Sequence, residues 1–467
     1  MEKLGWKGMG AMLAALAALP TAVAAEETSQ EDLSKRIDEL QQEIAVVKRQ
    51  LEVKQEQDAR DKDLTGIVTV DSQGFQIRSR DNHTYRLRLR GYVQSDGRFF
   101  VGNDEDANDT FLIRRARPIL EGTLFDILDF KLMPDFGGAG TSSTATATLQ
   151  DAWLDYRPWP WLQLQTGKYK PPVGLERLQS ATALVFIERA LPTTLVPNRD
   201  VGFMLQGDIG EGLAQYEVAA MNGVIDGGSS DANLNDAFDV IGRVFFQPFQ
   251  ETRLEFLQGL GVGVAASYGR QDTNANTAGS TSTPQYRTTG QQIFFSYGTG
   301  VQESDDQVRI APQAYWYWGP LGLMAEWVRS SPNLRLVTTG EERSPDIESW
   351  ELTGSWVVTG ENRSYLGVAP RTSFNPARED TGPGAWELVA RADGWKIDDT
   401  VFHHGFANPA TQAEKALEWG VGVNWYINPF LKIQLDYNET SFDGGGGANG
   451  GNRETEHVLG TRFQVAF

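Results

Sequence analysis

Residues 149–191, LQDAWLDYRPWPWLQLQTGKYKPPVGLERLQSATALVFIERAL, are the stretch from which the fold of this 467-residue sequence is best approached. Side chains of two kinds alternate over residues 150–156 and again over residues 161–166, as in strands that bury one face. Between these segments Pro158 and Pro160 flank a tryptophan, and proline cannot donate a backbone hydrogen bond to a strand ladder. The first half of the stretch therefore predicts two short strands joined by a tight turn.

The second half of the stretch predicts a long loop. The alternation stops after residues 168–172, KYKPP, and about 25 residues pass before the next predicted strand. They include Arg177, Glu188, Arg189 and Arg199. Loops of this length are uncommon inside compact domains and usually have a function. We therefore ask whether this loop lines a pore.

The first 25 residues are typical of a secretory signal peptide, because two lysines precede the apolar run 9–19 and small residues follow it. The chain has no cysteine, so neither disulfides nor a lipid anchor on cysteine is expected. No later stretch has the ~18 to 20 apolar residues that a helical membrane span needs. The expected product is either a soluble exported protein or a transmembrane β-barrel. The net charge of −20 argues against nucleic acid as a partner.

Residues 26–62 predict a short parallel coiled coil. Six apolar residues recur there at alternating spacings of four and three: Leu33, Ile37, Leu40, Ile44, Val47 and Leu51. This spacing is a heptad seam, and its residue types favour two strands, with three also possible. The alternative is an amphipathic helix that lies on its own domain. Residues 63–84 are predicted to form a linker with a possible small hairpin at 67–80.

From residue 85 to residue 467 the chain is a succession of alternating segments about ten residues long, separated by Gly, Pro, Asn and Asp clusters. Tight and long connections alternate, and tryptophans gather at segment ends, as in outer-membrane barrels. The last segment ends on Phe467, which resembles the signal recognised by the outer-membrane assembly machinery. Seventeen segments are candidates, and leaving out residues 291–297 gives the even number that bacterial barrels have. We predict an all-β fold, a 16-stranded antiparallel transmembrane barrel with an aqueous channel.

The sequence offers little for catalysis. The four histidines, at positions 83, 403, 404 and 457, lack metal-ligand spacing, and adjacent residues on a strand point to opposite faces. A G-x-S-x-G nucleophile motif is absent. We expect no enzyme activity, no cofactor and no metal site.

Arginines are concentrated on one face of the first two predicted strands. Parity places Arg86, Arg88, Arg90, Arg115 and Arg117 on the polar face, opposite apolar residues such as Leu112, whereas Arg114 is out of phase and requires a strand end or a bulge. Five or six guanidinium groups would then gather on one wall, and they need anions or carboxylates nearby. Their paired donors suit phosphate. The alternative is that carboxylates neutralise them in ordinary ion pairs, the candidates being Asp96, Glu121, Asp129 and Asp151.

Several motifs resemble, in the same order, those of the phosphate-selective porin O and P family. They are FLIRRAR at 111–117 with LEG at 120–122, DAW at 151–153 through GKY at 167–169, GLE at 174–176, ERAL at 188–191, AWEL at 385–388 and GVNWY at 422–426. The resemblance implies a trimer of 16-stranded barrels, with the third long loop folded into the pore. It also implies basic residues along the permeation path, at positions that match Arg114, Arg115, Arg189, Arg243 and Lys168.

These observations predict an outer-membrane porin for passive diffusion of small anions, phosphate or polyphosphate, through a pore narrowed by a loop at about 172–200. The predicted pore-lining residues are Arg86, Arg88, Arg90, Arg114, Arg115, Arg117, Lys168, Arg177, Arg189, Arg199 and Arg243. The expected partners are small anions, the outer-membrane bilayer and two further copies in a homotrimer, with the coiled coil in the periplasm near the cell wall. One alternative is a general, weakly selective porin with an envelope-tethering coiled coil. Another is a soluble β-rich binding protein.

Overall fold

The computed structural model describes residues 30–64, 66–71, 74–81, 83–102, 107–138, 146–233, 235–272, 283–447 and 450–467. It divides into two units, residues 1–65 and residues 66–467. The signal peptide predicted over residues 1–25 lies outside the described residues. No described helix is long and apolar enough to cross a membrane.

The first unit consists of one helix, α1 (Gln30–Leu64). The predicted helix is confirmed. Its six seam residues are about half exposed in the single chain, with Leu33 at 53% and Ile44 at 57%. The seam is thus not covered within the helix itself, and the coiled coil stays a prediction.

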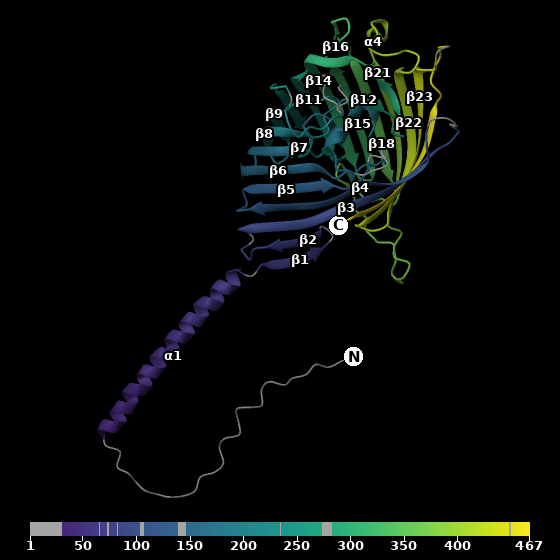
Figure 1. The fold of residues 1–467 in the computed structure, drawn as a ribbon. Helices are drawn as coiled ribbons and strands as arrows, with labels where there is room; N and C mark the ends of the chain where they lie inside the picture. Colours follow the sequence, from purple (N-terminus) through teal and green to yellow (C-terminus); the bar gives the residue numbers. More distant parts are fainter. Residues whose placement is uncertain are drawn as a thin grey trace. The chain divides into compact units, whose positions relative to one another are not determined.

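The second unit is a closed antiparallel barrel of sixteen strands, which confirms the predicted fold class (Figure 1). Each strand pairs with the next along the chain, and the last pairs with the first, Val465 opposite Val93. The barrel strands are β3 (Tyr85–Phe100), β4 (Thr110–Leu124), β5 (Leu128–Asp135), β6 (Thr148–Trp159), β7 (Leu162–Tyr169), β8 (Asp200–Ile209), β9 (Ala214–Met221), β10 (Asp239–Phe246), β11 (Leu260–Asp272), β14 (Val301–Trp318), β15 (Leu321–Ser331), β18 (Ile347–Val357), β21 (Ala385–Ile397), β22 (Ala413–Tyr426), β23 (Leu431–Gly444) and β24 (Glu456–Ala466).

The other elements lie in the connections between strands or next to the start of β3. They are β1 (Ile67–Asp71), β2 (Gly74–Arg78), α2 (Leu175–Leu178), η1 (Leu191–Thr194), α3 (Glu255–Gln258), β12 (Gln285–Arg287), β13 (Ile293–Ser296), β16 (Leu334–Leu336), β17 (Glu341–Arg343), β19 (Arg363–Ser364), β20 (Gly367–Val368) and α4 (Thr400–His403).

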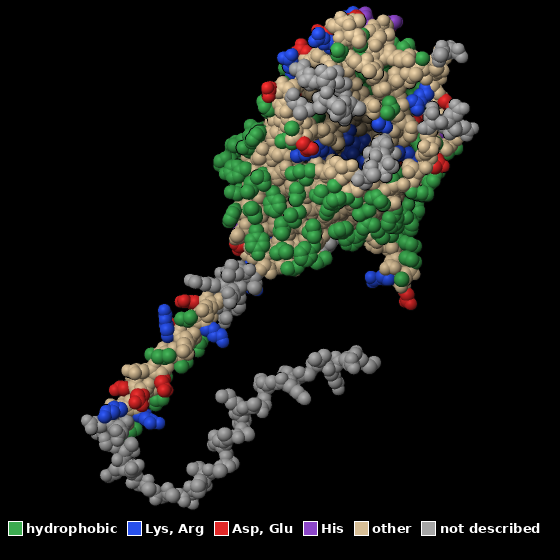
Figure 2. All heavy atoms as spheres, in the orientation of Figure 1, with side chains coloured by type: hydrophobic (Ala, Val, Ile, Leu, Met, Phe, Trp, Pro, Cys, Tyr) green, Lys and Arg blue, Asp and Glu red, His purple; other side chains and the backbone are tan. Residues whose placement is uncertain are grey.

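Alternation along each strand separates an outer apolar face from an inner polar face. On β10, Asp239 and Arg243 are buried, whereas Val240 and Phe246 are exposed. Period-2 patterning of this kind buries one face of a strand and leaves the other for lipid. Figure 2 shows the resulting belt of apolar side chains on the outside of the barrel.

The connections are short at one end of the barrel and mostly long at the other. The short ones include residues 125–127, 160–161 and 319–320, and we call their side the turn end, which is the periplasmic end in barrels of this type. Stacked tryptophan pairs lie there, among them Trp159 with Trp161 at 5.5 Å. One connection at the turn end, residues 358–384, is long and carries β19 and β20.

Two segments outside the sixteen barrel strands also form β-structure, residues 291–297 and the hairpin in the predicted linker. Residues 291–297, left out of the strand count, contribute β13 to a separate two-stranded sheet with β12, which confirms their exclusion. Phe294 and Phe295 of β13 contact Trp395 of β21 at 5.0 and 5.4 Å between ring centroids. The hairpin expected within the linker is present as β1 and β2, but β2 pairs with the first half of β3 and so extends the sheet.

Candidate anion-binding site

The connection between β7 and β8, residues 170–199, packs against the inner face of the barrel. Its backbone amides reach carboxylates of distant strands, with Leu175 N donating to Glu326 of β15 at 2.8 Å and Ile187 N donating to Asp436 of β23 at 2.7 Å. On another side, the carbonyl of Ala181 accepts from Gln94 of β3 at 3.1 Å. We call residues 170–199 the inner loop.

Two cavities lie on the two sides of the inner loop. The larger, of about 800 Å³, includes residues from the turn half of the barrel such as Arg90 and Lys131. The smaller, of about 350 Å³, includes residues 225–228 and 283–291 from the long connections. The lining residues that the two cavities share are Arg114, Arg115, Arg177 and Arg189. We call these four residues the arginine cluster.

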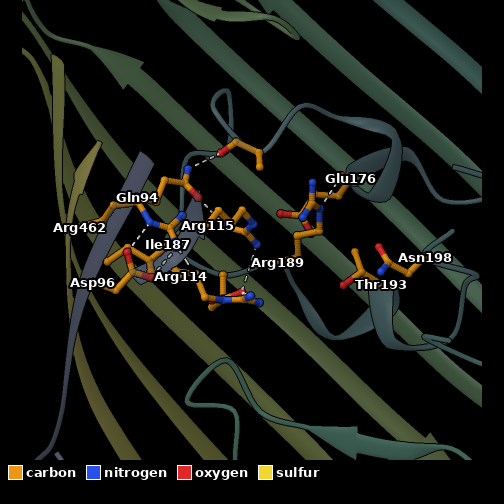
Figure 3. Close-up of polar contacts among 12 residues, drawn as sticks. Gln94, Asp96, Arg114, Arg115, Glu176, Ile187, Arg189, Thr193, Asn198 and Arg462 are labelled. Carbon is orange, nitrogen blue, oxygen red and sulfur yellow. Dashed lines mark hydrogen bonds and ion pairs between the residues drawn. The ribbon is translucent and has the colours of Figure 1, made fainter. Parts of the chain in front are cut away.

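A β-bulge turns two consecutive arginines toward the lumen. Opposite β3, Gln94 pairs with Arg115 and Ser95 pairs with Ile113, so that Arg114 has no partner in the register. Bulges of this kind re-aim side chains. The expected strand end or bulge at Arg114 is therefore confirmed as a bulge. Figure 3 shows Arg114 and Arg115 extending from β4 toward Arg189 of the inner loop.

One carboxylate, Glu188 of the inner loop, holds the strand arginines. Arg114 Nε donates to it at 2.5 Å, and Arg115 lies 3.8 Å away. Arg98 and Arg462 approach the same carboxylate at 4.0 and 3.9 Å. Burial disfavours the ionised form of Glu188, but the charges of Arg114 and Arg115 outweigh it and hold its pKa below the ordinary value. Arg462 has a closer partner in Asp96, at 2.6 Å, so the charge of Glu188 is shared mainly by Arg114 and Arg115.

The two loop arginines are held by neutral acceptors. Arg189 donates to the carbonyls of Glu176 at 3.0 Å and Gln179 at 2.8 Å. Arg177 donates to the carbonyl of Thr193 and to the side-chain oxygen of Asn198. Within the described part of the chain, neither guanidinium has a carboxylate within 4.0 Å. These contacts orient both groups and leave their charge uncompensated at short range.

Most basic residues elsewhere in the larger cavity have carboxylate partners, the exception among the described residues being Lys170. Arg117 pairs with Asp135 at 2.7 Å. Arg199 pairs with Asp151 at 2.6 Å, and Lys131 shares the same carboxylate at 2.9 Å. The cationic lining residues are Arg90, Arg114, Arg115, Arg117, Lys131, Lys170, Arg177, Arg189 and Arg199, against the carboxylates Asp135, Asp151 and Glu217. The cavity is therefore strongly basic as a whole.

Four of the predicted residues are absent from the lining of the larger cavity. They are Arg86, Arg88, Lys168, which pairs with Asp231, and Arg243, which pairs with Glu217 at 2.8 Å. Two basic lining residues were missing from the prediction, Lys131 and Lys170. Lys131 shares the parity of Asp129 on its strand, so the alternation alone could have identified it. Lys170 donates to the carbonyls of Leu178 and Gln179, a contact that the sequence does not encode locally.

The expectation that five or six guanidinium groups gather on one wall is wrong. Arg86 lies opposite Thr123, eight residues along β4 from Arg115, which corresponds to roughly 27 Å of strand. Arg86 and Arg88 line a separate cavity of about 360 Å³ at the turn end. Arg88 and Arg90 pair with Glu121 at 3.5 and 2.8 Å. The alternative, that carboxylates neutralise the arginines in ion pairs, is therefore correct for the arginines at the turn end.

Comparison with known proteins agrees with this architecture. Residues 87–467 match the family described as phosphate-selective porin O and P. Porin O of Pseudomonas aeruginosa is 25% identical over 429 residues, which cover 86% of this chain and 92% of that protein.

Solved structures with a similar fold are outer-membrane channels of low sequence identity. DcaP of Acinetobacter baumannii has a TM-score of 0.54 at 12% identity, over 84% of this chain and 99% of that one. An anion-selective porin from Comamonas acidovorans has a TM-score of 0.50 at 10% identity, over 82% of this chain and 100% of that one. From the family match and the barrel, this chain belongs to the phosphate-selective porin O and P family and is a non-enzymatic channel of the bacterial outer membrane.

Proposed function

We propose that this porin passes small anions, phosphate or polyphosphate, by passive diffusion past the arginine cluster. The observation that carries the proposal is the position of the four arginines between the two cavities. Arg114 and Arg115 meet one carboxylate there, Glu188, whereas Arg177 and Arg189 are held by carbonyl and amide oxygens. An anion that moves from one cavity to the other must pass these groups, whereas a cation meets a repulsive field.

The proposed mechanism is exchange of hydration for weak, successive contacts. Guanidinium donors replace part of the water around the entering anion, and their planar geometry matches the oxygens of phosphate in pairs. Arg177 and Arg189 are already oriented by backbone carbonyls, so little ordering is needed when the anion arrives. Arg117, Arg199 and Lys131 continue the basic path in the larger cavity. Their carboxylate partners weaken each contact, which lets the anion leave.

A homotrimer, with residues 26–62 as a periplasmic coiled coil, is part of the proposal. The half-exposed seam of α1 supports it, because a narrow apolar stripe needs other helices to cover it. A second support is the length of β5, β7, β9 and β10, which have eight residues each, fewer than the ~9 to 11 that a tilted strand needs to cross the hydrocarbon core. Neighbouring copies would cover this low part of the wall.

Single-channel conductance in chloride and phosphate salts tests the anion site. In the wild type we expect phosphate to reduce the chloride conductance, and we expect Arg115→Ala and Arg189→Ala to weaken this block by roughly tenfold each. A matched control is Arg335→Ala, which removes a half-exposed arginine of β16 that lines neither cavity. Equal phosphate block in all four proteins would contradict the proposal.

The alternative is a general, weakly selective porin whose coiled coil tethers the envelope. The carboxylate partners of Arg88, Arg117 and Arg199 favour it, because ordinary lumen ion pairs of this kind leave little net field. Deletion of residues 26–62 would then change envelope attachment or trimer stability and leave conductance intact. The two functions differ in a potassium chloride gradient, where only the selective channel gives an anion-driven zero-current potential.

A further inference from the structure

The hairpin β19–β20 enters the lumen from the turn end and is fastened to the inner loop. Tyr365 donates its hydroxyl to the carbonyl of Leu175 at 2.6 Å and accepts, through its own carbonyl, from Gln179 at 2.7 Å. The ring of Tyr365 stacks on Tyr315 of β14 at 5.5 Å. The hairpin tip therefore has a fixed position beneath the inner loop.

Leu366, at the tip of this hairpin, is the most exposed large hydrophobic residue in the described part of the chain, at 85%. It lines the larger cavity together with the arginine cluster. Its neighbour Tyr365 anchors the turn, so Leu366 is held in the lumen by the hairpin. At this exposure Leu366 buries little of its apolar area within its own chain, and this area can be buried by a molecule that enters the cavity.

Further apolar side chains face the same cavity from the barrel wall. Ile119 lies opposite Arg90, Met133 opposite Asp151, and Met204 opposite Gln165, all at positions that point to the lumen. The inner face of a channel barrel is normally polar. Ile119, Met133 and Met204 are themselves buried against their neighbours, whereas Trp153, which also lines the larger cavity, is only partly buried. One cavity thus combines a cationic side with an apolar side.

We propose that the larger cavity binds small organic anions, with a phosphate or carboxylate head on the arginine cluster and a ring-sized apolar body against Leu366 and Trp153. This inference rests on the proposed anion pathway and adds its substrate class. A volume of about 800 Å³ holds such a molecule. The inorganic anion with the same head makes only the polar contacts, so the organic anion binds about tenfold more tightly.

The test uses the full-length protein in planar bilayers and two matched pairs of anions. The half-blocking concentration for chloride current is measured for phenyl phosphate against inorganic phosphate, and for benzoate against acetate. We expect the aromatic member to block at about tenfold lower concentration in at least one pair, and the pair that responds identifies the preferred head. Equal half-blocking concentrations within both pairs would overturn the inference. A channel that still prefers anions over cations in that case would leave the proposed function standing.

Leu366→Asn supplies the residue-level test. Because Leu366 is 85% exposed, its replacement leaves the fold intact. We expect the half-blocking concentration of phenyl phosphate to rise about fivefold, with that of inorganic phosphate unchanged. Val337→Asn, which changes a half-exposed apolar residue outside both cavities, is the matched control. An equal rise for both anions, or none for either, would show that Leu366 does not contact the organic body.

Discussion

Two groups of arginines in this barrel have opposite electrostatic surroundings. The first is Arg86, Arg88 and Arg90, which we call the turn-end trio. It meets Asp126 and Glu121 on the neighbouring chain segments, and its side chains are 34–39% exposed. The second is the arginine cluster, in which Arg114 and Arg115 meet one carboxylate, Glu188, and Arg177 and Arg189 are held by carbonyl and amide oxygens. The number of arginines therefore does not set the local field, which depends on how many carboxylates the fold brings to them.

The difference has a structural origin. The turn-end trio sits on regular strand, where the register places Glu121 directly opposite Arg88. The arginine cluster combines a bulge in β4 with Arg177 and Arg189 of the inner loop, whose acceptors are carbonyl and amide oxygens of the same loop. Irregular backbone thus creates the uncompensated charge. Four variants test the difference between the two groups of arginines.

The largest effect is expected when both strand arginines of the cluster are neutralised. Arg114→Gln with Arg115→Gln should lower the chloride-to-potassium permeability ratio by about tenfold, because Glu188 then lacks its nearest counter-charges. The matched control is Arg86→Gln with Arg88→Gln, which should change the ratio by roughly twofold or less. Zero-current potentials in a potassium chloride gradient give both ratios. Similar losses in the two double variants would contradict the contrast between the groups.

A smaller change of opposite sign is expected for Glu188→Gln. The amide can still accept a hydrogen bond from Arg114, but the one negative charge of the cluster is removed. The permeability ratio should rise about threefold. Because the pKa of Glu188 is held below its ordinary value, the carboxylate stays ionised at neutral pH and the variant differs from the wild type there. A fall in the ratio would show that Glu188 acts mainly by positioning the arginines.

A pH dependence of up to about twofold is expected from Lys170. Burial lowers the pKa of Lys170, and the charges of Arg189 and Arg199 lower it further. Its ammonium therefore loses the proton at a lower pH than an ordinary lysine, and acidification restores the charge. The permeability ratio of the wild type should rise as the pH falls through the lowered pKa of Lys170. Lys170→Arg keeps the charge throughout and should flatten this profile, and an unchanged profile would exclude Lys170 as the titrating group.

The smallest effect is expected for Tyr365→Phe. It removes the hydroxyl that donates to the carbonyl of Leu175, a contact worth about 1 kcal/mol. The midpoint of heat-modifiable gel migration should fall by a few degrees at most, with unchanged conductance. Tyr268→Phe, which removes an exposed hydroxyl contact to Asp306, is the matched control. A lower midpoint in the control alone would show that the hairpin contact adds no stability.

Alternation alone was enough to predict the barrel, because period-2 patterning reports directly which face of a strand meets lipid. It also located the bulge, since Arg114 breaks the period. The alternation gave the wrong face for the residues just before Arg114. Leu112 was expected on the apolar face, but the bulge reverses the parity, so that Phe111 and Ile113 face outward at 79% and 47% exposure and Leu112 lies opposite Asp96.

The candidate site was predictable only in part. Arg114, Arg115, Arg177 and Arg189 were all named from the sequence, but their arrangement depends on contacts between distant segments. The inner loop is positioned by Glu326 and Asp436, which lie about 150 and 250 residues further along the chain. The hairpin with Leu366 was missed because residues 358–384 show no alternation. Local sequence patterns predict neither the contacts between distant segments nor a hairpin that lacks alternation.

The central claim is that uncompensated guanidinium charge in the arginine cluster makes this porin prefer anions. The most direct measurement is the zero-current potential of the wild-type protein across a planar bilayer with a potassium chloride gradient at pH 7. Anion preference predicts that the dilute compartment becomes negative, because chloride crosses faster than potassium. A dilute compartment that is positive, or a potential near zero, would contradict the account.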